Sequence, residues 1–150
     1  LRFEYRGVKV LLAHGSPRKV NEYLLPDRAD EQLARLAAAA DADVVCVGHV
    51  HVPYHRALAG ERGTVHYVSS GSVGKPKDGD PRACWVELLI GPYEDVHAAT
   101  DSDASVTTAG DTDTFVGVNT HRVEYDVESV ARTMTRAGLP ATLAAALRSA

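Results

Sequence analysis

Three histidines follow apolar segments that suit buried strands, and imidazole is the commonest metal ligand among side chains. His14 comes directly after VKVLLA, while His49 and then His51 follow VVCVG. Residues i and i+2 of an extended segment share a face, so we expect the rings of His49 and His51 on one side. Neighbouring strands would bring all three imidazoles to one sheet edge, where they could bind Zn, Fe, Mn or a related divalent metal. A His-X-His pair taken alone is more often an ordinary surface or hydrogen-bonded pair, and that alternative stays open.

Several other side chains have weaker claims to a site. Arg18 lies four residues after His14 and could donate a bidentate hydrogen-bond pair to a phosphate, although a solvated loop charge is the alternative. A later Gly- and Pro-rich loop carries basic residues that either line the site or close a turn against Asp78 and Asp80, namely Lys75, Lys77 and Arg82. We interpret the remaining histidines and large aromatics as packing, surface or pocket-wall residues: His55, His66, Tyr23 and Trp85.

The elements that must position these residues are predicted from hydrophobic periodicity. Residues 1–13 indicate a hairpin with its turn at Arg6-Gly7, and a helix is predicted over about 31–40 with Asp30 as its N-cap. Further strands are expected at 44–48, 54–60, 64–70, 83–90 and 121–127, and helices at about 127–137 and 141–148. This mixture of strands and helices is typical of an α/β or α+β layered fold.

The negative charge of the chain is confined to one segment. The 150 residues carry a formal net charge of −4, but segment 93–118 contains six acidic residues and no Lys or Arg, so the remainder is mildly basic. Because this segment is rich in Ser, Thr, Asp and Ala, we predict a long flexible acidic loop at about 93–118. The remainder tolerates an anionic substrate such as a nucleotide, while its charge is too weak to indicate binding to nucleic acid.

Length and composition bound the class of protein. A chain of 150 residues is long enough for a single domain with a substantial core. No apolar run approaches the roughly 18 residues of a membrane span, so no membrane partner is expected. Cys46 and Cys84 both lie in apolar strand-like segments, which indicates reduced, buried thiols and a cytoplasmic protein, with a disulfide as the weaker alternative.

A set of motifs resembles the carboxyl-terminal part of a calcineurin-like metallophosphoesterase of the compact bacterial type. These motifs are HGSP, EYLLPD, VVCVGHVHVPY, SSGSVGKPKDGDPRACWVEL and VEYDVESVARTMTRAGLP, and they span about residues 1–92 and 119–140. The resemblance implies a two-sheet α/β sandwich and hydrolysis of phosphate mono- or diesters by a metal-bound hydroxide at a dinuclear centre. It implies that His14 and His49 bind one metal and His51 the other, with Mn, Fe, Zn or Ni as candidate ions.

The sequence departs from the pattern of this family in its metal-binding motifs. The family has Asp-X-His, Gly-Asp-X-X-Asp and Gly-Asn-His-Asp/Glu upstream of its lone histidine, and none of these precedes His14. Residues 69–72 read Ser-Ser-Gly-Ser where relatives commonly have Asn-Pro-Gly-Ser, which affects one substrate-contacting loop. We therefore expect an upstream half of the same domain, before Leu1, to supply the bridging carboxylate, the amide ligand and the general acid.

Two functional classes remain open at this stage. The first is a metal-dependent phosphatase or phosphodiesterase that acts on a phosphate ester once its upstream half is present. The second is a non-catalytic scaffold of the same fold, because the superfamily includes a retromer subunit that serves as a platform for protein interactions. Retention of His14, His49 and His51 favours the enzyme.

Overall fold

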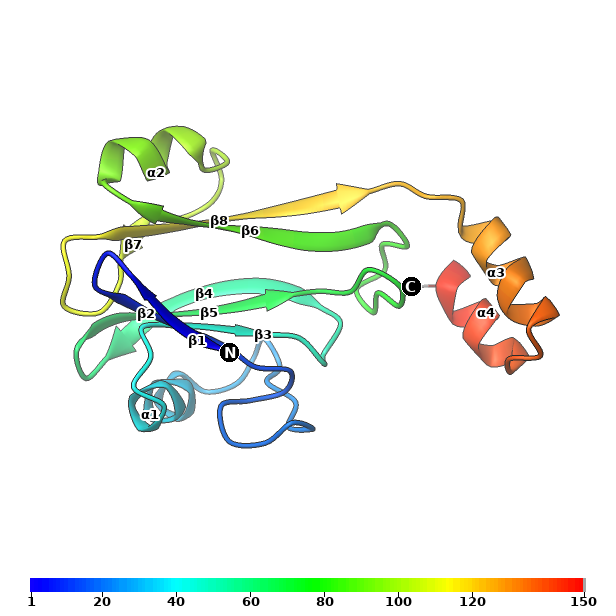
Figure 1. The fold of residues 1–150 in the computed structure, drawn as a ribbon, viewed down its shortest axis with the longest axis horizontal. Coiled ribbons are helices and arrows are strands. Elements are labelled where there is room, and N and C mark those ends of the chain that lie inside the picture. Colours follow the sequence, from blue (N-terminus) through cyan, green and yellow to red (C-terminus); the bar gives the residue numbers. More distant parts are fainter. Residues whose placement is uncertain (150) are drawn as a thin grey trace.

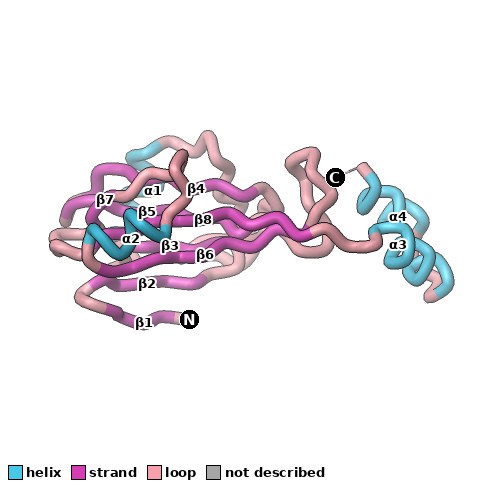
Figure 2. Tube along the Cα trace, turned by 90° about the horizontal axis from the view of Figure 1, so that it is seen from above, coloured by secondary structure: helices cyan, strands magenta, loops and turns pink. Residues whose placement is uncertain are grey.

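Two β-sheets face each other in the computed structural model, which describes residues 1–149 (Figure 1). The larger sheet has the strand order β1-β2-β3-β5-β4, and the smaller sheet has the order β6-β8-β7. Helix α1 covers the larger sheet and helix α2 covers the smaller one (Figures 1 and 2). The predicted two-sheet α/β sandwich is confirmed.

The strands are β1 Arg2–Tyr5, β2 Val8–Leu12, β3 Val44–Val47, β4 Pro53–Gly60, β5 Gly63–Ser70, β6 Ala83–Gly91, β7 Thr107–Thr108 and β8 Phe115–Val123. The helices are α1 Asp30–Ala39, α2 Tyr93–Ala99, α3 Val127–Arg136 and α4 Ala141–Arg148. Most predicted strands and helices outside the acidic segment are present, with boundaries that shift by a few residues. The strand predicted at 121–127 is misplaced, because β8 begins at Phe115 inside the acidic segment and ends at Val123.

The first hairpin and the parallel strands set the geometry of the larger sheet. Arg6 and Gly7 connect β1 to β2 with φ angles of 52° and 80°, as a two-residue turn of type I′ requires. β2 and β3 are parallel, and so are β3 and β5. The carboxyl ends of these three strands therefore meet at one edge of the sheet, which is where the sequence places the histidines.

Buried side chains on both faces hold the larger sheet in place. Side chains alternate along β3, so Val45 packs under α1 with Leu33, whereas Val44 packs between the two sheets with Val116 and Val118. All five of these side chains are less than 5% exposed. Strand β3 is therefore a rigid support for the loop that follows it.

Helix α1 does not begin as the sequence suggests. Ala29 occupies the N-cap position and makes no side-chain capping hydrogen bond, so the prediction of Asp30 as the N-cap is wrong. Asp30 is the first residue of the helix, and its carboxylate forms an ion pair with Arg56 of β4. A carboxylate in the first turn is also favoured by the positive end of the helix dipole.

The prediction of a continuous loop over 93–118 is wrong, because α2, β7 and the start of β8 lie inside it. Val96 of α2 is buried against the smaller sheet, and Ala109 and Val116 are completely buried between the two sheets. These few apolar residues are sufficient to order the segment, because the two sheets already provide an apolar surface on which they pack. Composition alone does not reveal such a surface.

The last two helices form a unit beyond one end of the sandwich (Figures 1 and 2). α3 and α4 pack on each other through a small cluster formed by Ala131, Ala144 and Leu147. Gly138, with a φ of 73°, allows the sharp turn between them. None of the helices within residues 1–149 is long and apolar enough to cross a membrane.

Both cysteines are free thiols in the structure. Cys84 is buried, and Cys46 is partly buried between the sheets. Burial raises the pKa of the Cys46 thiol to about 11, which keeps it protonated at neutral pH.

A pair of histidines, of which His66 is buried and His55 partly buried, is expected to make stability fall in acid. Nε2 of His55 lies 3.0 Å from Nδ1 of His66, and Nε2 of His66 donates to the Thr108 carbonyl over 2.9 Å. Burial, followed by the neighbouring His66, lowers the pKa of His55 to about 4, and burial also lowers the pKa of His66. The unfolded chain, with a histidine pKa near 6.5, therefore binds protons that the folded chain excludes, and stability falls between about pH 6.5 and 4.

Urea unfolding of the protein between pH 7 and 4.5 measures this dependence. His55→Gln should flatten it, whereas His97→Gln, which changes an exposed histidine on α2, should leave it unchanged. The same slope in wild type and His55→Gln would contradict the interpretation.

Candidate metal centre

Backbone hydrogen bonds join the ends of β2 and β3 and place His14 beside His49. The Ala13 N–H donates to the Cys46 carbonyl and the Gly48 N–H donates to the His14 carbonyl, each over 2.9 Å. As a result, Nε2 of His14 lies 3.0 Å from Nδ1 of His49, with the ring centroids 4.8 Å apart. Of the three imidazoles predicted to meet at one sheet edge, the structure brings these two together.

His51 is held separately, by the loop that follows β5. Its Nδ1 lies 2.7 Å from the Lys75 carbonyl oxygen, and the Lys77 N–H donates to the His51 carbonyl over 3.1 Å. His49 and His51 have φ angles of 63° and 62°, so this segment is not extended and the argument from alternating faces is wrong. Such angles are uncommon for residues other than glycine and cluster at functional sites, where the surrounding contacts maintain them.

The arrangement of the imidazoles fits part of a metal site. Metal–nitrogen bonds of about 2.0–2.1 Å place two ligands of one ion roughly 3 Å apart, which matches His14 and His49. A backbone carbonyl that accepts from Nδ1, as Lys75 does for His51, is the usual way to orient a metal-binding histidine through Nε2. However, residues 1–149 contain no group of three or more His, Cys, Asp or Glu side chains placed to hold a metal.

Tyr23 lies beside His49, and Lys77 from a different loop lies over the Tyr23 ring. The Tyr23 ring centroid is 4.3 Å from that of His49, and Lys77 Nζ is 5.8 Å from the centroid of the Tyr23 ring. Tyr23 is 48% exposed, so it is a wall residue and not a core residue. No spacing in the sequence pairs Tyr23 with His49, because only the fold brings their loops together.

Arg18 lies in a different cluster from the histidines. Its Nη2 forms an ion pair of 2.6 Å with Oε1 of Glu22, and Arg28 contacts the same oxygen at 3.3 Å. Hydrogen bonds from Arg18 and Ser16 lower the pKa of Glu22 to about 2. The guanidinium of Arg18 is thus engaged with a carboxylate beside α1.

The basic residues of loop 71–82 have separate roles. Arg82 pairs with Asp80 over 2.7 Å, which supports the prediction that these two close a turn. Asp78 instead pairs with Arg122 of β8, which ties the loop to the smaller sheet. Lys75 contributes its main-chain carbonyl to the orientation of His51.

The remaining candidates lie away from this edge. His55 and His66 form the pair described above, so their assignment to packing is confirmed. Trp85 is 47% exposed and stacks on His121 with centroids 4.1 Å apart, so it is not a core residue. An Asp-X-His triplet does occur at 95–97, but it lies on α2 above the smaller sheet.

Gly15→Ala is expected to weaken metal binding by about tenfold, the lower end of the range for residues that orient ligands. A Cβ at Gly15 would meet the main-chain carbonyl of Val20 and would lie 2.7 Å from that of Lys19, so the turn after His14 must open. Titration of the metal-free protein with Zn²⁺ measures the affinity. Gly74→Ala is the matched control, since nothing lies within 4 Å of its Cβ. Equal affinity in Gly15→Ala and wild type would contradict the proposed role of this turn.

Comparisons with known proteins agree with this architecture. A search of curated proteins found no significant match. A metallophosphoesterase from Sphaerobacter thermophilus is 26% identical with a TM-score of 0.61, and the match covers 99% of this chain and 56% of that one. A hypothetical protein from Pyrococcus horikoshii OT3 is 17% identical with a TM-score of 0.67, and covers 98% and 48% respectively, which supports the fold alone. The chain therefore spans about half the length of these two proteins.

The family assignment rests on the part of the chain that carries the histidines. A family model described as the calcineurin-like phosphoesterase superfamily domain matches residues 1–89, which is more than half of the chain. This range contains His14, His49 and His51 together with the whole larger sheet. The chain belongs to the calcineurin-like phosphoesterase superfamily.

Proposed function

We propose that the edge of the larger sheet at His14, His49 and His51 is part of a dinuclear centre that hydrolyses phosphate mono- or diesters. The observation that carries this proposal is the 3.0 Å distance between Nε2 of His14 and Nδ1 of His49 at the ends of two parallel strands. Membership of the superfamily supports metal-dependent hydrolysis of phosphate esters. Divalent ions in such a centre supply charge that polarises a phosphoryl oxygen and lowers the pKa of water.

Each histidine has a defined role in this proposal. His14 and His49 bind one ion through Nε2 and Nδ1, which requires that both rings are neutral and direct lone pairs toward the same point. His51 binds the other ion through Nε2, because its Nδ1–H is donated to the Lys75 carbonyl.

Tyr23 and Lys77 would position the ester beside these ligands. The ammonium group of Lys77 lies over the Tyr23 ring and adds positive charge that attracts a phosphate anion. The Tyr23 ring packs on His49 and forms an apolar wall against which the organic part of an ester can lie.

In this proposal the carboxylate ligands come from elsewhere in the protein. Three imidazoles cannot fill two coordination spheres, and no cluster within residues 1–149 adds a carboxylate to them. We assign the bridging carboxylate, the amide ligand and the general acid to chain outside residues 1–150. The proposal is supported by the finding that these residues span about half the length of similar structures.

Chelator-sensitive hydrolysis by the intact protein that contains residues 1–150 tests the proposed function. Dialysis against EDTA should abolish hydrolysis, and Mn²⁺ or Zn²⁺ should restore it. Comparison of p-nitrophenyl phosphate with bis(p-nitrophenyl) phosphate separates phosphatase from phosphodiesterase activity. Hydrolysis that EDTA leaves unchanged would contradict metal dependence. No hydrolysis of either ester with any added metal would favour the protein-interaction scaffold.

A further inference from the structure

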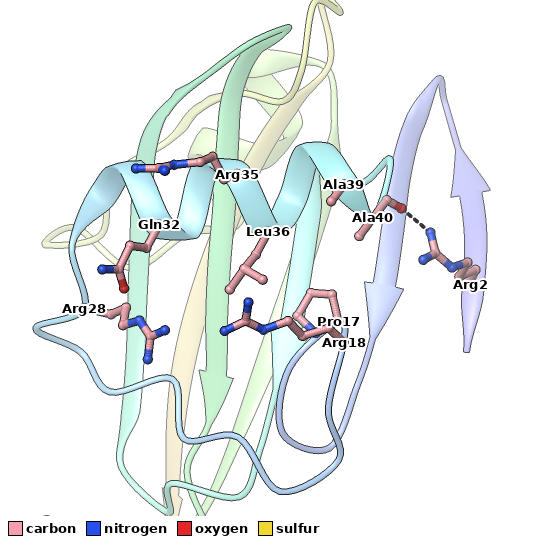
Figure 3. Close-up of a pocket in the computed structure, with 9 residues that line it drawn as sticks. All are labelled: Arg2, Pro17, Arg18, Arg28, Gln32, Arg35, Leu36, Ala39 and Ala40. Atoms are coloured by element: carbon pink, nitrogen blue, oxygen red, sulfur yellow. Dashed lines mark hydrogen bonds between the residues drawn. The ribbon is translucent and has the colours of Figure 1, made fainter.

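A groove of about 510 Å³ lies between α1 and the loop that connects β2 to α1 (Figure 3). None of the three candidate metal ligands lines it. Arg2 lies at one end, where its guanidinium donates to the Ala40 carbonyl at the end of α1. The other residues that matter for its chemistry are Pro17, Arg18, Arg28, Gln32, Arg35 and Leu36.

Four guanidinium groups line this groove, those of Arg2, Arg18, Arg28 and Arg35. Glu22 accepts from Arg18 and also pairs with Arg28. Within the described part of the chain, Arg2 and Arg35 donate only to main-chain carbonyl groups. The groove is therefore cationic, and guanidinium is the side chain best suited to bidentate binding of phosphate.

One of these arginines also lacks a hydrogen-bond acceptor. Nε of Arg28 is buried, and no described residue accepts a hydrogen bond from it. Buried polar atoms are almost always paired, so an unpaired donor in the wall of a groove indicates a missing partner. A small reorientation of Arg28 toward an anion in the groove would give this atom an acceptor.

The groove also has an apolar wall. The Leu36 side chain projects from α1 toward the Arg18 guanidinium, with Pro17 beside it (Figure 3). The volume falls in the range of about 300–1,000 Å³ that is typical of small-molecule sites. Inorganic phosphate would leave this wall uncovered, whereas a planar ring would cover it and could also stack on a guanidinium group.

We propose that this groove binds a small organic phosphate with a planar ring, of the chemical class of a nucleoside monophosphate. The phosphate accepts hydrogen bonds from Arg18 and Arg28 at one side of the groove, with Arg35 adding charge at its rim. The ring lies on Pro17 and Leu36. Binding here needs no metal and is separate from the histidine edge, so it goes beyond the proposed function.

Isothermal titration of the intact protein with AMP in the presence of EDTA tests this site, because EDTA removes ions that would bind phosphate at the histidine edge. AMP should bind at least about tenfold more tightly than inorganic phosphate or adenosine. Arg18→Gln and Arg35→Gln should each weaken AMP binding by about tenfold, because each removes a charged donor. Arg136→Gln changes an exposed helical arginine on α3, outside the groove, and should leave the affinity unchanged.

Three outcomes would overturn the proposal. They are no AMP binding at millimolar concentration, equal AMP affinity in wild type and both groove variants, and equal affinity for AMP and inorganic phosphate. Thermal melting of each variant separates loss of the site from loss of the fold. Since metal is absent throughout, none of these results depends on whether the protein hydrolyses phosphate esters.

Discussion

Residues 1–150 alone, supplied with Mn²⁺, are expected to hydrolyse an aryl phosphate ester no faster than buffer with the same metal. His14 and His49 lie close enough to bind one ion, but imidazoles leave its charge unbalanced. Two cations about 3.5–4 Å apart repel each other unless anionic ligands lie between them. No group of side chains within residues 1–149 provides such ligands. Release of p-nitrophenol from p-nitrophenyl phosphate measures the activity.

Co-expression with the proposed upstream half of the domain is the matching positive test. It should restore turnover by orders of magnitude, and EDTA should abolish that turnover. Vigorous, EDTA-sensitive hydrolysis by residues 1–150 alone would show that other acids complete the centre.

The acids nearest in sequence to His51, on the loop that holds it, are poor candidates for this role. Asp78 is paired with Arg122, and Asp80 is paired with Arg82. The hydrogen bonds from Arg82 lower the pKa of Asp80 to about 2, so it is ionised but already neutralised by its partner. Metal binding would first have to break these ion pairs.

His49→Ala in the intact protein is expected to reduce bound metal from close to two ions toward one and to lower the hydrolysis rate by about 100-fold or more. The change removes Nδ1 of one of the two imidazoles that face each other at 3.0 Å. Loss of a direct ligand should cost more than the 10–100-fold typical of residues that only orient ligands. Elemental analysis and the rate of p-nitrophenyl phosphate hydrolysis measure the two effects.

Two further variants separate this loss from an effect on folding. His49 has a φ of 63°, a conformation that asparagine tolerates better than alanine, so His49→Asn keeps the backbone with less strain. It should still lose metal and activity. His97→Ala removes an exposed imidazole on α2 and should change neither. Equal metal content in wild type and His49→Ala would remove His49 from the ligand set.

Local patterns in the sequence were sufficient for most of the elements. The alternation and length of apolar runs indicate the strands of the larger sheet and β6, and Arg6-Gly7 marks the first turn, because each signal depends on neighbours within a few residues. The helices at 127–137 and 141–148 followed from periodicity and the intervening Gly and Pro. Placement of His14 and His49 after apolar strands predicted that they would meet at one edge.

Packing between residues far apart in the chain determined the features that these local patterns did not predict. Segment 93–118 reads as a loop because its composition is polar, yet Ala109 and Val116 are completely buried where two sheets close around them. Asp30 has the residue type of an N-cap, but its partner is Arg56 on a distant strand. In both places a contact between residues far apart in the chain outweighs a weak local preference.

The sequence by itself determined which residue types stand at the sheet edge, since strand ends and histidine positions are properties of the chain read in order. Only the tertiary structure decided that His14 and His49 lie 3.0 Å apart, that Tyr23 covers His49, and that Arg18 turns to Glu22. It also decided that the Lys75 carbonyl orients the His51 ring and that the backbone at His49 and His51 has positive φ angles. The physical reason is that ligand distances and ring orientations depend on strand pairing and loop contacts between distant residues, which no local spacing encodes.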